Sequence, residues 1–122
     1  MALLEHVDTW LYHLGNINAA RMGVIGRSHA DLAVIDHAHG DNTLFTGAQL
    51  DKMRGSNDKM LISYLSIGEA ETYRSYWQAT WETAPPGFLG EENPEWMDNI
   101  KVKYWKDAWK EIIFDYVDQI VD

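Results

Sequence analysis

The 122-residue chain contains no cysteine. This absence excludes a disulfide framework, a zinc site built from thiolates and a cysteine nucleophile. Basic side chains are also few, because ten lysines and arginines stand against 19 aspartates and glutamates, for a formal net charge of −9. That charge disfavours nucleic acid and anionic membranes as partners and leaves cationic or neutral ligands.

Long apolar runs are missing as well. Acids, histidines or lysines interrupt every run before it reaches the roughly 18 apolar residues that a bilayer-spanning helix needs. The N-terminus, Met-Ala-Leu-Leu-Glu-His-Val-Asp, lacks the basic region and apolar stretch of a secretory signal. As the chain stands, we expect a cytoplasmic protein with no membrane partner; the alternative is that a signal was removed before this numbering begins. With 46% hydrophobic and 24% charged residues, it can form one ordinary globular domain, which we expect to span residues 1–122.

The apolar pattern predicts four strands, each followed by a helix. Short aromatic or apolar runs predict strands over residues 7–14, 31–36, 59–67 and 100–105. Helical spacing and stop residues predict helices over residues 17–25, 46–54, 71–81 and 106–121, with a long ordered loop over residues 88–96. This alternation favours an α/β fold of four βα units, with parallel strands joined by right-handed crossovers.

The segment that starts at Leu61 reads Leu-Ile-Ser-Tyr-Leu-Ser-Ile-Gly-Glu-Ala-Glu and is followed by Tyr73-Arg74 and Tyr76-Trp77. It resembles the third-strand motif of the endo-α-1,4-polygalactosaminidases, glycoside hydrolase family 114. Further segments match that family in the same order, at Trp10–Leu14, Ala33–Asp36, Phe88–Trp96 and Val102–Trp105. The resemblance extends over residues 7–121.

The resemblance implies half of a TIM-type (β/α)8 barrel, a fold that usually needs about 250 residues. In the family, the fifth strand follows the helix at which this chain stops, and the acids thought to perform hydrolysis lie largely on later strands. The chain should therefore lack at least one of them. We expect a carbohydrate-related protein that acts on or binds galactosaminan, an amino-sugar polysaccharide, without a cofactor. The alternatives are a non-enzymatic binding or assembly module from a truncated gene, and an incomplete fragment of a longer enzyme.

Two carboxylates are the candidate catalytic residues. Asp36 ends a predicted buried strand, and barrel enzymes place their chemistry at the C-terminal ends of strands. Glu69 follows Gly68 just past the neighbouring strand, and adjacent strands lie about 4.8 Å apart. Glycosidases use two carboxylates about 5 to 9.5 Å apart, so one site across these strands is permitted. Alternatively, Asp36 caps the following loop and Glu69 is an acid in the first turn of a helix.

Six further residues are candidates for substrate binding, because they lie in the matching motifs: Tyr12, Tyr64, Glu71, Arg74, Lys103 and Trp105. Glu71 and Arg74 are three apart on a predicted helix, so a modest surface ion pair is the alternative. Tyr64 is otherwise a core aromatic residue. At Lys103 the family often has arginine, and lysine weakens a bidentate contact with a carboxylate.

Histidines after the second predicted strand offer a metal-binding alternative. His37, His39 and Asp41 alternate with other residues, and two histidines with a carboxylate can hold zinc or iron. A solvated polar loop explains the same pattern, and we predict no metal site.

Four parallel strands also predict an assembly. In a half-barrel, the chain's own helices cover only the outer face of the sheet, and the first and fourth strands leave unpaired edges. Two copies related by a twofold axis would close eight strands. We therefore predict a homodimer.

Overall fold

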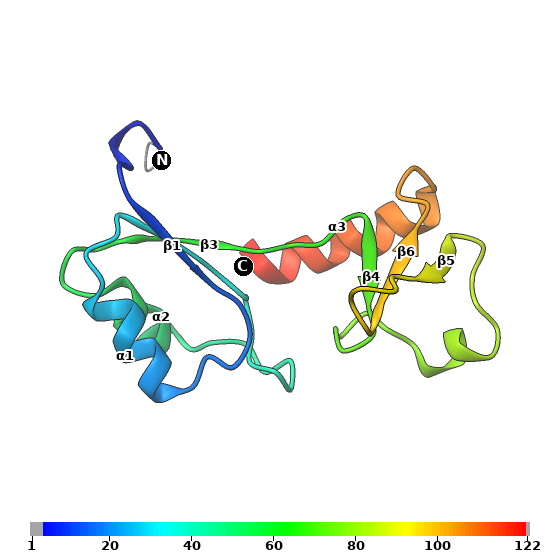
Figure 1. Ribbon diagram of the computed structural model, residues 1–122, viewed down its shortest axis with the longest axis horizontal. Coiled ribbons are helices and arrows are strands. Elements are labelled where there is room, and N and C mark those ends of the chain that lie inside the picture. Colours follow the sequence, from blue (N-terminus) through cyan, green and yellow to red (C-terminus); the bar gives the residue numbers. More distant parts are fainter. Residues whose placement is uncertain (1–3, 122) are drawn as a thin grey trace. The chain divides into compact units, whose positions relative to one another are not determined.

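The computed structural model describes residues 4–121, which form two compact units, one within Met1–Tyr64 and one within Leu65–Asp122 (Figure 1). The expectation of a single domain over residues 1–122 stays a prediction.

The first unit is a parallel sheet of three strands with two connecting helices. Its elements are η1 (Leu4–His6), β1 (Trp10–His13), α1 (Ala19–Arg27), β2 (Leu32–Ile35), α2 (Gly47–Arg54) and β3 (Met60–Ser63). The strand order is β1-β2-β3, and all neighbours run parallel. The first three predicted strands and the first two predicted helices are therefore confirmed as elements, with somewhat different bounds.

Local hydrogen bonds cap the two helices and join the starts of two strands. The Asn18 side chain caps α1 by accepting from the Arg21 N–H at 2.9 Å, and Thr46 with Gln49 forms a capping box at α2. At the N-terminal ends of β1 and β2, Asp31 Oδ2 accepts from the backbone N–H and the hydroxyl of Thr9, both at 3.0 Å. These bonds lower the pKa of the Asp31 carboxyl. They also tie the start of β2 to the start of β1.

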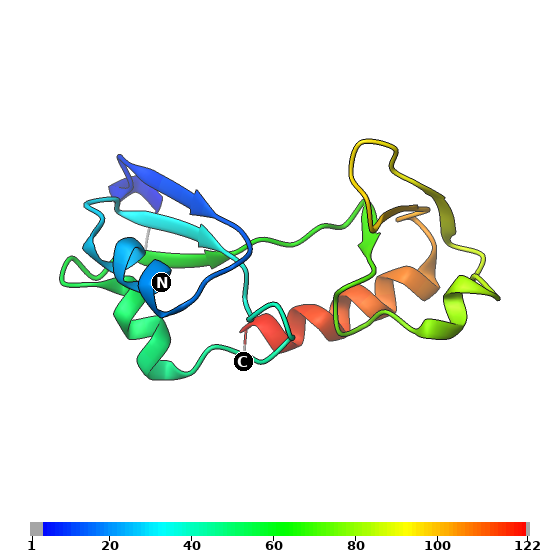
Figure 2. The same cartoon turned by 60° about the horizontal axis from the view of Figure 1, so that its bottom comes forward.

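Both helices cover the same face of the sheet (Figure 2). Their apolar residues pack against Ala33 and Ile35 of β2 and form the first core, which includes Ile17, Met22, Ile25, Phe45 and Met53. On the opposite face, Trp10 is 67% exposed, Tyr12 63% and Ile62 41%. The register places these exposed residues in rows with Leu32, Val34 and Met60. Within this unit, the exposed side chains of this face lie on the two outer strands, while Leu32 on the central strand is buried.

The two helices approach each other closely at their C-terminal ends. A Cβ atom on Gly26 would lie 2.1 Å from the backbone oxygen of Lys52, and one on Gly55 (φ 70°) would lie 2.0 Å from the oxygen of Gly26. Glycine is therefore required at the crossing. At these C-terminal ends, the buried Lys59 ammonium donates to the carbonyls of Gly26 (3.3 Å) and Arg54 (3.0 Å). Lys59 thus stabilises the negative ends of both helices, although burial lowers the pKa of its ammonium.

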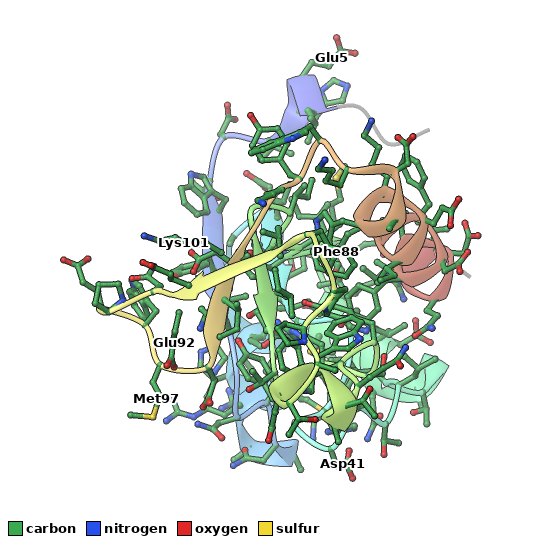
Figure 3. All side chains as sticks on the ribbon, turned by 90° about the vertical axis from the view of Figure 1, so that its right-hand side faces the viewer. Glu5, Asp41, Phe88, Glu92, Met97 and Lys101 are labelled. Carbon is green, nitrogen blue, oxygen red and sulfur yellow. The ribbon has the colours of Figure 1, made fainter. Side chains whose placement is uncertain are left out.

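The second unit is an antiparallel sheet packed with one long helix. Its elements are β4 (Glu69–Glu71), η2 (Ala79–Glu82), β5 (Leu89–Glu92), β6 (Asn99–Val102) and α3 (Asp107–Val121), with strand order β4-β6-β5. Figure 3 shows the β5–β6 hairpin, with Glu92 and Lys101 on it and Met97 at its turn. No helix within residues 4–121 has the length and apolar character needed to cross a membrane.

The prediction of a fourth parallel strand is wrong. The segment predicted as residues 100–105 forms β6, but it pairs antiparallel with β4 and β5 instead of extending the parallel sheet. The reason is local, because the predicted loop over residues 88–96 contains β5, which makes a hairpin with β6. The helix that follows is confirmed as α3. The structure thus holds a three-stranded parallel sheet, and closure into a half-barrel stays a prediction.

The helix predicted over residues 71–81 is also wrong. Glu71 belongs to β4, and only Ala79–Glu82 forms a short 3-10 helix. The aromatic residues Tyr73, Tyr76 and Trp77, whose spacing predicts a helix, lie in a series of turns. Tyr76 packs edge-to-face on Trp109 and Tyr116, with ring centroids 5.5 and 5.1 Å apart. Trp109 is 1% exposed and its Nε1 donates to the Ile67 carbonyl at 2.9 Å, so this residue belongs to the core.

Candidate functional site

Asp36 lies at the C-terminal edge of the parallel sheet, immediately after β2, as predicted. Its side chain is buried, and Oδ2 accepts from the Gly15 N–H at 2.6 Å. Gly15 has a φ of 74° and begins the turn after β1, so its positive φ allows the N–H to meet the carboxylate. Asp36 therefore fastens the β1–α1 loop to the end of β2.

A shallow pocket of about 220 Å³ lies at this edge. It is lined by residues of the loops after β1 and β2: Asn16, Ile17, Asn18, His39 and Gly40. His39 is fixed on one side by Phe45, whose ring centroid is 4.5 Å away, and its Nε2 lies 3.4 Å from the Gln49 Oε1. The pocket therefore has a mixed polar and apolar lining from the β1–α1 and β2–α2 loops.

The histidine loop forms ordered turns. Asp41 accepts from the Thr43 N–H at 3.0 Å, which lowers the pKa of its carboxyl, and its side chain points away from the ribbon (Figure 3). The His39 N–H donates to the Thr43 carbonyl at 2.8 Å. Across residues 4–121, no group of three or more histidines and acids is arranged to hold a metal ion.

Glu69 begins β4, and no helix starts at this residue. Its Oε1 accepts from the Asn93 side chain at 3.3 Å. Its Oε2 is shielded from solvent and has no hydrogen-bond partner among the described residues. A buried carboxylate oxygen without a donor costs stability, and few such groups occur in native structures.

Glu71 and Arg74 form a buried ion pair, which replaces the surface pair considered from the sequence. Their side chains are 6% and 11% exposed, and Arg74 Nε lies 3.2 Å from Glu71 Oε1. The Tyr73 hydroxyl donates to Glu71 Oε2, while the Glu71 N–H donates to the Tyr76 hydroxyl at 2.8 Å. Burial is the main cause that raises the pKa of Tyr76. This network holds the turns after β4.

The other predicted binding residues lie on both units. Tyr12 stands on the uncovered face of β1, and half-buried Tyr64 follows β3, where its N–H donates to the Ile35 carbonyl at 2.9 Å. Lys103 and Trp105 lie in the turn between β6 and α3, and Trp105 is 57% exposed. Asp36 and Glu69 belong to different units, so their pairing across one site stays a prediction.

Two partners of the candidate carboxylates were not predicted from the sequence. Gly15 and Asn93 lie 21 and 24 residues from the carboxylates that they contact. No local pattern connects Gly15 with Asp36. Asn93 lay in the segment predicted as a loop, and no spacing rule connects it with Glu69.

Comparisons with known proteins identify the family. The profile of the glycoside-hydrolase family GH114 matches residues 3–122. An uncharacterised protein of Methanocaldococcus jannaschii is 42% identical over 114 residues, which cover 92% of this chain and 32% of that protein. Uncharacterised proteins of Thermotoga maritima and Deinococcus radiodurans are 39% and 34% identical, with 94% and 97% of this chain covered and 35% and 38% of theirs. The chain thus spans about a third of the length of these relatives. From its profile match over nearly all residues, the chain belongs to glycoside-hydrolase family GH114.

Proposed function

We propose that this chain binds an α-1,4-linked polymer of galactosamine and supplies carboxylates to its hydrolysis. The observation that carries the proposal is the buried Glu69 Oε2, which lacks a hydrogen-bond donor among the described residues while Asn93 fixes the other oxygen. Membership of a glycoside-hydrolase family supports a sugar as the ligand. Sugar hydroxyls and the ammonium group of galactosamine are donors of the kind that this oxygen lacks.

The chemistry needs a second acid. Glycosidases combine a general acid with a carboxylate that acts as nucleophile or base, about 5 to 9.5 Å apart. Asp36 is a separate candidate acid on the first unit, and its carboxylate is oriented by the Gly15 N–H at 2.6 Å. The resemblance implies further acids on later strands of the family's barrel. We therefore expect sugar binding by these 122 residues and no complete hydrolysis by them alone.

Tyr12 and Tyr64 would line the substrate path and offer aromatic faces for sugar rings. Both oxygens of Glu71 already accept from Tyr73 or Arg74, so we assign this pair to positioning of the binding surface. The net charge of −9 favours a cationic polymer at long range.

The test is titration of the chain with a galactosamine trimer at low ionic strength. Glu69→Gln and Asp36→Asn should each weaken binding about tenfold, because each removes a charge-assisted hydrogen bond. Glu111→Gln, an exposed acid on α3, is the matched control and should bind as the wild type does. No binding by the wild type, or equal affinities for all four proteins, would refute the proposal.

A non-enzymatic assembly module is the second candidate. The observation that favours it is the uncovered apolar face of the parallel sheet, with Trp10, Tyr12 and Ile62 exposed. Parallel sheets normally have both faces covered. The homodimer stays a prediction, and molar mass in solution tests it: a dimer whose melting temperature falls on dilution supports it, and a well-folded monomer contradicts it.

A further inference from the structure

A cationic and aromatic turn connects β6 to α3. We call it the Lys-Tyr-Trp-Lys turn, and it consists of residues 103–106. Tyr104 and Trp105 are each 57% exposed and lie edge-to-face, with ring centroids 5.2 Å apart and an interplanar angle of 85°. Two large rings on the surface that support each other in this way can present an apolar platform to a ligand.

Backbone bonds and a buried anchor hold this turn in place. The Lys103 N–H donates to the Phe88 carbonyl at 2.8 Å, and the Lys106 N–H donates to the Lys103 carbonyl at 2.9 Å. Just beyond, Trp109 is 1% exposed, so the start of α3 is fixed in the core of the unit. Ligand binding therefore needs little ordering of the backbone, which favours affinity.

The charge of the turn is opposite to that of the chain. The chain has six lysines, and four of them lie within residues 101–110, although the net charge of the chain is −9. Lys110 pairs with Asp107 at 3.4 Å. Lys103 and Lys106 are exposed, and neither forms an ion pair with any residue in the described part of the chain. Two unpaired cations thus flank the aromatic platform.

We propose that the Lys-Tyr-Trp-Lys turn is a subsite for an anionic sugar unit such as a hexuronate, and that it rejects galactosamine. A hexuronate ring offers an apolar C–H face to Trp105 and a carboxylate to the lysines. A galactosamine ammonium would meet two like charges. The proposal rests on the proposed function only in taking a sugar as the ligand.

Other anionic partners fit less well. A nucleic acid strand or an anionic bilayer carries many charges over a wide area and meets the repulsion of the whole acidic chain. A single sugar carboxylate interacts mainly with charges inside one Debye length, which is about 10 Å at moderate salt. The local pair of lysines therefore decides the sign of the interaction for a short ligand.

The experiment is titration of the chain with three trisaccharides: galacturonate, galactose and galactosamine. At about 0.1 M salt, where the Debye length is about 10 Å, we expect the galacturonate trimer to bind about tenfold more tightly than the galactose trimer, since two exposed lysines attract its charges. High salt should remove most of this preference. Lys103→Gln with Lys106→Gln should abolish it, and Trp105→Ala should weaken binding of both trimers.

Matched controls come from the same unit. Trp96→Ala removes a tryptophan that is 66% exposed on the β5–β6 turn, and Lys110→Gln removes a lysine that is already paired. Both should leave galacturonate binding unchanged. The proposal is overturned if the controls lose as much affinity, or if the wild type does not bind galacturonate. It is also overturned if the galactosamine trimer binds more tightly at this turn, or if anionic vesicles or single-stranded DNA bind in place of the sugar.

Glu69→Gln separates this proposal from the proposed function. It should leave galacturonate binding at the turn unchanged while it weakens binding of the galactosamine trimer. If Glu69→Gln binds the galactosamine trimer as tightly as the wild type does, the role of Glu69 is contradicted. If Glu69→Gln loses galacturonate binding, the anionic subsite is contradicted.

Discussion

The crossing of α1 and α2 gives the strongest stability prediction. In Gly26→Ala, the new Cβ would lie 2.1 Å from the Lys52 oxygen and 3.3 Å from the Lys52 carbonyl carbon. Both are backbone atoms, so no rotamer change relieves the clash, and the helices must separate by about 1 Å. Overpacking of this kind costs about 1–3 kcal/mol, and a backbone obstacle belongs at the upper end of that range.

The gain in helix propensity offsets part of this cost. Alanine is favoured over glycine in a helix by about 1 kcal/mol, so we expect a net loss of about 2 kcal/mol in the free energy of unfolding. For a unit of this size, that corresponds to a fall in melting temperature of roughly 10 °C. The assay is urea unfolding followed by circular dichroism.

Gly23→Ala on the same helix is the matched control. Its Cβ would meet only the flexible end of Arg27, 3.0 Å from Nη1. Because that side chain can move away, we expect a gain of about 0.5–1 kcal/mol from helix propensity. The reasoning is refuted when Gly26→Ala unfolds at the wild-type urea concentration, or when Gly23→Ala loses as much stability.

Three further predictions concern buried or bonded charges. Lys59→Met removes the side-chain donor of the Gly26 and Arg54 carbonyls, of which, among the described residues, only the Arg54 carbonyl keeps a backbone donor, and should lower stability by about 2 kcal/mol. Because burial lowers the pKa of Lys59, the folded state binds fewer protons than the unfolded state, so wild-type stability should rise as pH approaches about 10.4, and Lys59→Met should lose this slope in alkaline urea titrations. Arg74→Met should cost about 3–5 kcal/mol, because the Glu71 charge stays buried without its partner, whereas adding Glu71→Gln should restore part of the loss in the same unfolding assay. Hydrogen bonds lower the pKa of Asp31, so its contribution is present above about pH 3.9 and disappears as pH falls through the lowered folded-state value; Asp31→Asn should show a weaker loss of urea resistance below pH 4.

The parallel sheet could be predicted because its signals are local. Apolar runs without alternation and clear stop residues such as Gly55 mark β2, α2 and β3, and the stripe from Trp109 to Tyr116 marks α3. The antiparallel unit could not be predicted in this way. Its strands have three or four residues each, too few for a periodic pattern to emerge. The aromatic spacing around Tyr76 imitates a helix, while its hydroxyl accepts a bond from the backbone of β4.

The candidate site divides in the same way. Asp36 could be placed at a strand end from the sequence, because it directly follows a buried run. The surroundings of Glu69 depend on a contact with Asn93 across 24 residues, which no local pattern encodes. The burial of the Glu71–Arg74 pair was likewise hidden, since a spacing of three residues is typical of a surface pair on a helix.

A structure of the chain with a bound galactosamine trimer tests the central claim most directly. The account predicts that an ammonium or hydroxyl group of the sugar lies within about 2.7–3.2 Å of the Glu69 Oε2, which has no donor among the described residues without ligand. A trimer bound elsewhere, with this oxygen still lacking a donor from the sugar, would contradict the role proposed for Glu69.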